Sequence, residues 1–387
     1  MRWHYRCASC GATYEIEPGR YLCDRCAARQ RPQRPLEGIL EAHWEGDAGG
    51  EVPLPVEPAW FAPIPVGGTP LWAPARLRDR YGAPNLWLKD DTCNPSASFK
   101  DRASHLVAAF ARRHGIREVV LASTGNAASS MAAIGAAAGL AVKVFLPASA
   151  PAAKRVQVLQ YGAELVTVDG TYDRAFDLCL DYSRRTGALS RNTAYNPLTI
   201  EGKKTAAFEI AADLAAAGAP APAHVFVPTG DGVILAGLYR GFEDLAQLGR
   251  LRRMPTLWAC QAEGSSAIAR ALATGREGSE AFDAPRPSRT VADSIAVDVP
   301  RNGVHALAKL RLHGGRAVTL SDDEILAAQH TLAAGCGLFA EPSSSAAFAG
   351  WLRVREQLPA EETCVLLITG SGLKDIASAA RAFALDT

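Results

Sequence analysis

Short apolar runs alternate along the chain with longer segments whose apolar residues recur at helical spacing. The runs predict buried strands at 85–89, 119–122, 142–147, 164–168, 224–228, 256–261 and 363–368. Helical patterns are found at 103–113, from 127, and at 151–161, 172–186, 201–214 and 233–248. Ser321 reads as the N-cap of another helix, because acidic residues follow it. This alternation predicts an α/β fold with open parallel sheets covered by helices.

Length and composition limit the class of protein. The chain has 387 residues, more than one domain usually holds, so we expect at least two domains. Its net charge of +1 gives no basic footprint for nucleic acid or for an anionic membrane. No apolar run approaches a membrane span, and the N-terminus has no apolar signal core. Nine cysteines without secretory features favour the cytoplasm.

Four of the cysteines form a tight N-terminal set. Cys7 and Cys10 make one Cys-x-x-Cys pair, Cys23 and Cys26 make another, and twelve residues separate the pairs. Two such pairs can place four thiolates tetrahedrally around zinc, and four ligands leave no open position for catalysis. We therefore predict a structural zinc ribbon over residues 1–30, with a metal-free or redox-active ribbon as the alternative. Residues 31–66 are rich in Pro, Arg, Glu and Gly and predict an extended connector.

Lys100 lies where a polar loop, 94–99, becomes a helix. Desolvation and the positive end of a helix both oppose a charged lysine, and a lysine with a lowered pKa can form a Schiff base with a carbonyl compound. Three other loops follow predicted strands and carry glycines, at 123–126, 229–232 and 369–372. Such loops admit an anion to backbone amides at the carboxyl end of a parallel sheet. A reactive lysine with a phosphate cradle suggests pyridoxal phosphate.

The motifs around these loops resemble one family. The stretch Asn-Pro-Ser-Ala-Ser-Phe-Lys-Asp-Arg at 94–102 resembles the lysine motif of threonine synthases, and 123–126, 201–210, 341–347 and 369–375 resemble their other motifs in the same order. The chain is similar over about residues 65–380 to fold type II pyridoxal-phosphate enzymes, in their threonine synthase-like branch. The resemblance implies a two-domain fold, with a large domain at 67–99 and 196–387 and a small domain at 100–195. It also favours a homodimer.

The resemblance implies a role for each motif residue. Lys100 would hold the cofactor aldehyde and then move protons on the substrate. Asn126 would bind the 3′-oxygen of the pyridine ring, and Thr369 would contact the ring nitrogen. The remaining assignments are Ser123, Thr124 and Gly125 for the substrate carboxylate, and Gly230, Asp231, Gly232, Val233 and Ile234 for the cofactor phosphate. A neutral hydroxyl at the ring nitrogen leaves a moderate electron sink, which suits elimination and replacement.

Departures from the family pattern concern the substrate side. Ser96-Ala97 replaces the usual Thr-Gly, Asp231 stands in the phosphate loop, and Ser371 stands where a histidine is common. Because a carboxylate beside a phosphate is unfavourable, we expect Asp231 to be turned outward. A phosphorylated substrate needs a second anion site. Its candidates are Lys203, Lys204, Lys154, Arg155, Asn192 and a loop carrying Arg301 and Asn302 that is long enough to close over a site. The alternative for Lys203 and Lys204 is a solvated helix face.

Three functions remain open from the sequence. The first is a threonine synthase-like lyase that converts O-phospho-L-homoserine and water to L-threonine and phosphate. The second is β-replacement or β-elimination on a serine-type substrate, as in cysteate synthase-like or dehydratase-like relatives. The third is a non-catalytic homologue whose ribbon binds a partner, which the intact Lys100, Asn126 and Thr369 argue against.

Overall fold

The structure is a computed structural model that describes residues 1–148, 152–170 and 172–383. The chain divides into two compact units. Unit 1 contains residues 1–29, 37–67 and 94–203, and unit 2 contains residues 30–36, 68–93 and 204–387. The cysteine ribbon and most of the connector therefore belong to the same unit as the expected small domain, 100–195. The other unit takes only residues 30–36, which are the last residue of the expected ribbon and the first six of the connector.

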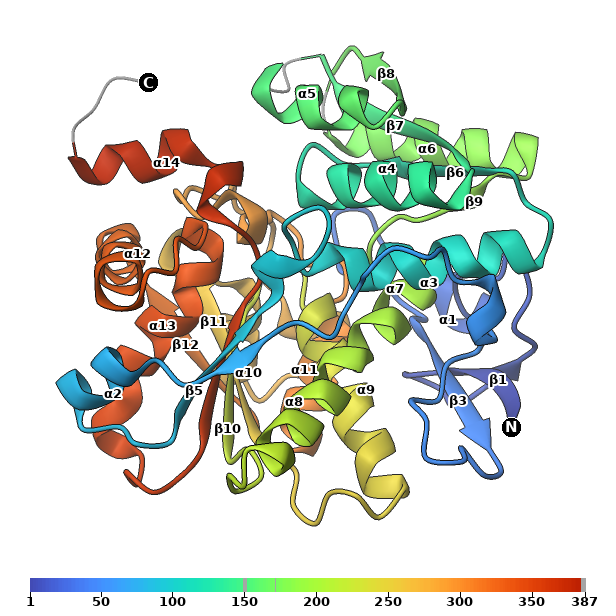
Figure 1. The fold of residues 1–387 in the computed structure, drawn as a ribbon. Helices are drawn as coiled ribbons and strands as arrows, with labels where there is room; N and C mark the ends of the chain where they lie inside the picture. The colour runs from blue at the N-terminus through green and yellow to red at the C-terminus, as the bar shows by residue number, and fades with distance from the viewer. Residues whose placement is uncertain (149–151, 171, 384–387) are drawn as a thin grey trace. The chain divides into compact units, whose positions relative to one another are not determined.

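Unit 2 is built on a six-stranded sheet in the order β12-β11-β10-β13-β5-β4, parallel except for the pairing of β4 with β5. Figure 1 shows α12 and α13 on one face of this sheet and α8 and α9 on the other. The strands are β4 (Leu71–Trp72), β5 (Leu86–Asp90), β10 (His224–Pro228), β11 (Thr256–Ala262), β12 (Arg316–Leu320) and β13 (Cys364–Ile368). The helices are α2 (Ala75–Tyr81), α8 (Thr205–Ala216), α9 (Val233–Gln247), α10 (Ala267–Ala273), α11 (Gly303–Leu312), α12 (Asp322–Cys336), α13 (Pro342–Val354) and α14 (Ile376–Ala380).

Unit 1 holds a four-stranded parallel sheet in the order β8-β7-β6-β9. Its strands are β6 (Glu118–Ala122), β7 (Ala141–Pro147), β8 (Glu164–Val168) and β9 (Leu189–Ser190), and its helices are α3 (Lys100–Arg113), α4 (Asn126–Ala138), α5 (Ala152–Gln160), α6 (Tyr172–Thr186) and α7 (Leu198–Glu201). Alternate residues of β6 point to opposite faces. Val119 and Leu121 join a core with α3 and α4, whereas Val120 and Ala122 join a core with α6. Burial on both faces explains why the strand is apolar from Val119 to Ala122.

The N-terminal ribbon is a second, antiparallel sheet of unit 1. It has the order β2-β1-β3 and contains β1 (Arg2–Cys7), β2 (Thr13–Tyr14) and β3 (Leu40–Glu45), with the short helix α1 (Asp24–Ala27) beside it. The strand β3 lies within the expected connector, 31–66, so the ribbon sheet extends beyond the expected residues 1–30. The later part of the connector contributes buried Val56 and the half-buried Phe61 and Ile64 to the core around α3 and β6. The connector is therefore a packed part of unit 1.

Every strand predicted from the sequence pattern is present within one residue of its expected bounds, but β12, β4 and β9 of the parallel-containing sheets were not predicted. Ser321 caps α12 in a full capping box with Glu324, as expected. One expected helix, 201–214, is interrupted, because α7 ends at Glu201 and α8 begins at Thr205. The expected loop over 275–303 contains only two short 3-10 turns, Gly278–Ala281 and Asp293–Ile295. Among the described residues no helix combines the length and the apolar character needed to cross a membrane.

Candidate active site and cysteine cluster

The four N-terminal cysteines converge on one point. Their sulfur atoms all lie within 4.8 Å of one another. The Cys7 and Cys26 sulfurs are 3.8 Å apart, and the Cys10 and Cys23 sulfurs are 3.6 Å apart. Tetrahedral zinc with Zn–S bonds of about 2.3 Å requires sulfur separations of about 3.8 Å. The cluster thus has the dimensions of a tetrahedral four-thiolate metal site.

Neighbouring groups adjust the charge of this cluster. The Tyr14 hydroxyl is 3.1 Å from the Cys23 sulfur, and the Arg29 guanidinium donates to the Cys26 sulfur at 3.2 Å. Burial opposes ionisation of Cys23, but hydrogen bonds from Tyr14 and other groups outweigh it and lower the pKa of Cys23 to about 6. Burial and the neighbouring thiols raise the pKa of Cys26 to about 12. Four thiolates at this spacing therefore need a cation among them.

Lys100 is the first residue of α3 and is half-buried. The loop before it is closed by Asp101, whose carboxylate accepts hydrogen bonds from the backbone N–H of Ser96 at 2.7 Å and from its hydroxyl at 2.5 Å. Ala97, where the family commonly has glycine, has a φ of 59°. A left-handed alanine costs roughly 1 kcal/mol, so the two Asp101 contacts hold a mildly strained loop in place. Sequence reasoning had assigned no role to Asp101.

The Ser123 loop leads from β6 into α4, whose first residue is the buried Asn126. Gly125 is the N-cap and supplies no side-chain hydrogen bond, although the Ser123 hydroxyl accepts from the Gly125 N–H at 3.2 Å. A Cβ at Gly125 would meet no atom within 4 Å. The loop thus leads into the N-terminus of a 13-residue helix with open space at Gly125, a place that favours an anion such as a carboxylate.

Two of the expected cofactor loops leave adjacent strands of unit 2. β10 pairs directly with β13, and the two strands run parallel. The loop 229–232 follows β10 and the loop 369–372 follows β13, so both loops lie at the carboxyl edge of one sheet. Ligands of open parallel sheets bind at this edge. The structure therefore brings together the expected phosphate loop and Thr369.

The phosphate loop fits an anion. Gly232, with a φ of 85°, is the N-cap of the 15-residue helix α9 and provides no side-chain cap. A Cβ on Gly230 would lie 2.9 Å from the Ile295 Cα, so the loop backbone is packed where only glycine fits. The Asp231 carboxylate accepts from the Arg301 N–H at 3.1 Å. Asp231 is half-buried, so it is turned toward the Arg301 loop instead of simply outward to solvent.

The first residues of α13 and the residue before it form hydrogen bonds with the Thr369 loop. The Ser344 hydroxyl lies 2.9 Å from the Thr369 hydroxyl and accepts from the Thr369 N–H at 3.1 Å. The Glu341 N–H donates to the Gly370 carbonyl at 2.9 Å. A Cβ on Gly370 would come within 2.7 Å of the Glu341 carboxylate. The motif at 341–347 thus positions Thr369, a role that the sequence alone did not indicate.

Lys203 and Lys204, the predicted substrate residues, are both fully buried. The Lys203 ammonium donates to the Thr199 carbonyl at 2.6 Å. The Lys204 ammonium pairs with the fully buried Asp244 at 2.7 Å. Neither lysine forms the solvated helix face considered from the sequence, and the geometry places Lys204 in an internal ion pair.

The other phosphate candidates differ in what they contact. Asn192 is buried and accepts from the Ala122 N–H at 2.7 Å, so it supports the strand before the Ser123 loop. The buried Asn302 donates to the Gly232 carbonyl at 3.2 Å, so its loop is fastened to the start of α9. The Lys154 side chain lies outside the described residues. Arg155 shares a small depression with Ser123 and Thr124 in unit 1.

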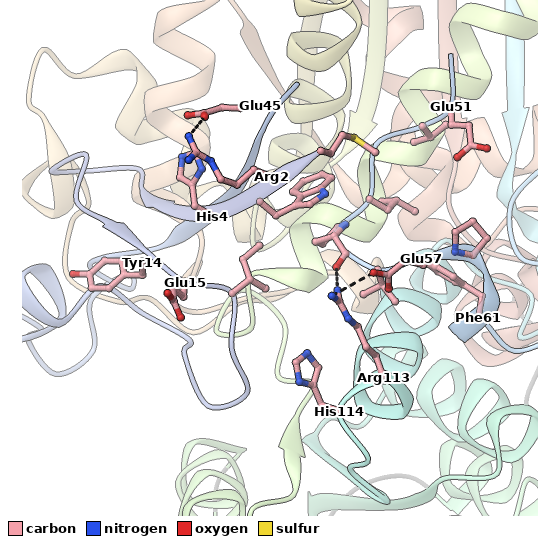
Figure 2. A pocket seen from close by; sticks show the side chains of 18 of the residues that line it. Arg2, His4, Tyr14, Glu15, Glu45, Glu51, Glu57, Phe61, Arg113 and His114 are labelled. Carbon is pink, nitrogen blue, oxygen red and sulfur yellow. Dashed lines mark hydrogen bonds and ion pairs between the residues drawn. The ribbon is translucent and has the colours of Figure 1, made fainter. Parts of the chain in front are cut away.

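A cavity of about 1320 Å³ in unit 1 contains none of the predicted site residues. Figure 2 shows its wall, which is formed by the ribbon, the connector and the end of α3. Arg2 pairs there with Glu45, and Arg113 pairs with Glu57 at 3.3 Å. Because carboxylates neutralise both arginines, the cavity does not supply the second anion site.

Comparison with known proteins identifies the family. Residues 63–370 match the family described as pyridoxal-phosphate dependent enzyme. The chain is 33% identical to the threonine synthase of Methanosarcina acetivorans, over 96% of this chain and 92% of the relative. It is 35% identical to that of Mycobacterium bovis, over 88% and 90%.

Solved structures agree on the fold. The threonine deaminase of T.th. superposes with a TM-score of 0.66 at 25% identity, covering 78% of this chain and 92% of that one. Maize serine racemase superposes with a TM-score of 0.69 at 18% identity, covering 81% and 91%. The chain therefore belongs to the fold type II pyridoxal-phosphate-dependent enzymes, in their threonine synthase-like branch, and is a lyase.

Proposed function

We propose that this lyase converts O-phospho-L-homoserine and water to L-threonine and phosphate. The observation that carries the proposal is the extent of the similarity to threonine synthases, which reaches 31–35% identity over 80–97% of the chain. The bound pyridoxal phosphate would supply an electron sink for charge that develops at the substrate Cα. The side chains of this protein then have to bind, orient and transfer protons.

Lys100 is proposed to hold the cofactor and to act as the acid-base group. Its amine would take the proton from the substrate Cα and would serve the neighbouring carbons as the phosphate departs and water adds. Its position at the start of α3 disfavours a permanently charged ammonium, because the helix N-terminus is itself positive. Asp101 supports this role by fixing the loop that carries the lysine.

Two uncapped helix starts are proposed to receive the anionic groups. Gly230 to Ile234, at the start of α9, would hold the cofactor phosphate through backbone amides. Ser123, Thr124 and Gly125 would hold the substrate carboxylate, and Asn126 would bind the ring 3′-oxygen. Of the cationic candidates for the substrate phosphate we favour Arg155, because it lies beside Ser123 and Thr124.

The alternative is β-replacement or β-elimination on a serine-type substrate, and the second phosphate site separates the two functions. The test offers the purified, cofactor-loaded protein O-phosphohomoserine, O-phosphoserine and serine in separate assays. Release of phosphate with threonine as the product, from the first substrate only, is expected. Turnover of a serine-type substrate with none of phosphohomoserine would replace the proposal with the alternative. Arg155→Ala should raise KM for phosphohomoserine at least tenfold.

A second lysine variant serves as the control for the proposed role of Lys100. Lys100→Ala should abolish turnover, whereas Lys143→Ala, which removes an ammonium paired with Glu164 at 3.1 Å, should not. Equal loss in both variants would show that the effect is structural.

We also propose that the cysteine cluster holds one structural zinc, that the protein is a homodimer, and that it works in the cytoplasm. The sulfur spacing supports the first proposal. Metal analysis should find one zinc per chain, and light scattering coupled to gel filtration should give twice the chain mass of 41.0 kDa. A monomer mass or a metal-free protein that keeps its fold would refute the corresponding proposal.

A further inference from the structure

The hydroxyl of Ser344 contacts Thr369, the residue expected at the ring nitrogen of the cofactor. Ser344 is fully buried in the first turn of α13, and Thr369 is 7% exposed at the end of β13. Ser344 contacts Thr369 twice, since its oxygen accepts from the Thr369 N–H at 3.1 Å and lies 2.9 Å from the Thr369 hydroxyl.

The second contact can run in either direction. The Ser344 hydroxyl has one proton and two acceptors within reach, the Thr369 hydroxyl and the Gly370 carbonyl at 3.1 Å. The Gly370 carbonyl also accepts from the Glu341 N–H at 2.9 Å, so it keeps a donor when the Ser344 proton points to Thr369. That arrangement gives the Thr369 oxygen a donor and leaves the Thr369 proton for a further partner. Within the described residues we find no other partner for that hydroxyl.

We propose that Ser344 is a positioning residue that makes Thr369 a hydrogen-bond donor to the ring nitrogen of the cofactor. When Ser344 donates to the Thr369 oxygen, the Thr369 proton must point to a third partner. A donated proton favours an unprotonated ring nitrogen and disfavours the pyridinium form. If Ser344 donated to Gly370 instead, the Thr369 hydroxyl could donate to Ser344 and present a lone pair, which would favour the pyridinium. The inference rests on the proposed role of Thr369.

The neighbouring Ser345 provides a matched control. It is also fully buried, one residue further along α13, but its hydroxyl donates to the Glu341 carbonyl at 3.1 Å. Ser345→Ala therefore removes an equally buried hydroxyl from the same helix turn without touching Thr369.

The test follows the pyridine nitrogen directly. The full-length protein is loaded with pyridoxal phosphate carrying ¹⁵N in the ring, and the ¹⁵N resonance is recorded against pH. In Ser344→Ala the pH of half-protonation should rise by about half to one unit, the effect of losing one neutral hydrogen bond. Ser345→Ala should titrate like the wild type. No shift in Ser344→Ala, or equal shifts in both variants, would overturn the proposal.

Two further variants protect the result. Ser344→Cys keeps a side chain of similar size but a much weaker donor, so it should fold and shift in the same direction. In a Thr369→Val background, Ser344→Ala should add no shift, and an added shift would show that Ser344 acts without Thr369. Mass spectrometry after borohydride reduction checks the underlying function. Failure to find the cofactor on Lys100 would overturn both proposals, whereas a labelled Lys100 with no titration shift would overturn only the positioning role.

Discussion

Replacing Lys204 with methionine separates a structural role for this lysine from a role in binding substrate. Lys204 and Asp244 are both fully buried and their charged atoms are 2.7 Å apart. Removing one member of a buried pair costs about 3–5 kcal/mol, because the other charge is left uncompensated. Asp244 also accepts from Arg240 at 2.9 Å, so one cation remains. We therefore expect Lys204→Met to lose about 3 kcal/mol of unfolding free energy.

Substitution of the partner carboxylate tests the same pair. Asp244→Asn removes the anion that Lys204 and Arg240 share, but Arg240 keeps its ion pair with Glu243 at 2.7 Å, so we again expect a loss of about 3–5 kcal/mol. Urea unfolding measures both losses, and KM for phosphohomoserine is measured on the folded fraction. KM should stay within about twofold of the wild type. A Lys204→Met protein of unchanged stability with KM raised tenfold or more would refute this reasoning and return Lys204 to the substrate site.

Three other perturbations test separate parts of the structure. Tyr14→Phe removes the hydroxyl contact to Cys23, so zinc retention should fall about tenfold in a chelator competition, and unchanged retention would contradict the assignment. Gly230→Ala places a Cβ 2.9 Å from the Ile295 backbone, so the affinity for the cofactor, measured by fluorescence titration, should fall at least tenfold. The control is Gly275→Ala, because a Cβ there meets no atom within 4 Å. Burial lowers the pKa of His105 below its usual 6.5, so the unfolded chain binds more protons at this residue than the folded chain does. The contribution of neutral His105 to the unfolding free energy is therefore present above pH 6.5 and is lost as pH falls. Urea midpoints at about pH 7.5 and about pH 5.5 should therefore differ, and His105→Gln should reduce the difference.

Local patterns were enough for the parallel sheets and for the start of α12. The central strands β10 and β13 are mostly apolar because they are covered on two faces, and Ser321 carries its capping box within four residues. The glycine loops at the strand ends were also visible, because the chemistry of an anion site at a helix start is local. These features need no partner that is distant in the sequence.

The burial of Lys203 and Lys204 could not be predicted in the same way. Two lysines beside a glycine at a helix start are typical of an exposed surface, and the partner of Lys204 lies 40 residues away. The interruption between α7 and α8 has a similar origin. A Cβ at Gly202 would lie 2.4 Å from the Arg102 carbonyl, so this turn is set by close packing against α3. The grip of Ser344 on Thr369 likewise spans 25 residues.

The interleaving of the two units has a consequence for synthesis on the ribosome. Unit 1 is complete once residue 203 has been made. The first strands of unit 2, within 68–93, pair and pack with segments that follow residue 204. The central strand β13, which pairs with β5, is made long after β5, at 364–368. Leu86 and Leu88 of β5 are completely covered in the finished sheet and remain uncovered until then. The nascent chain therefore carries an apolar strand without its partner while residues 91–363 are translated, and we expect chaperones to be needed during that interval.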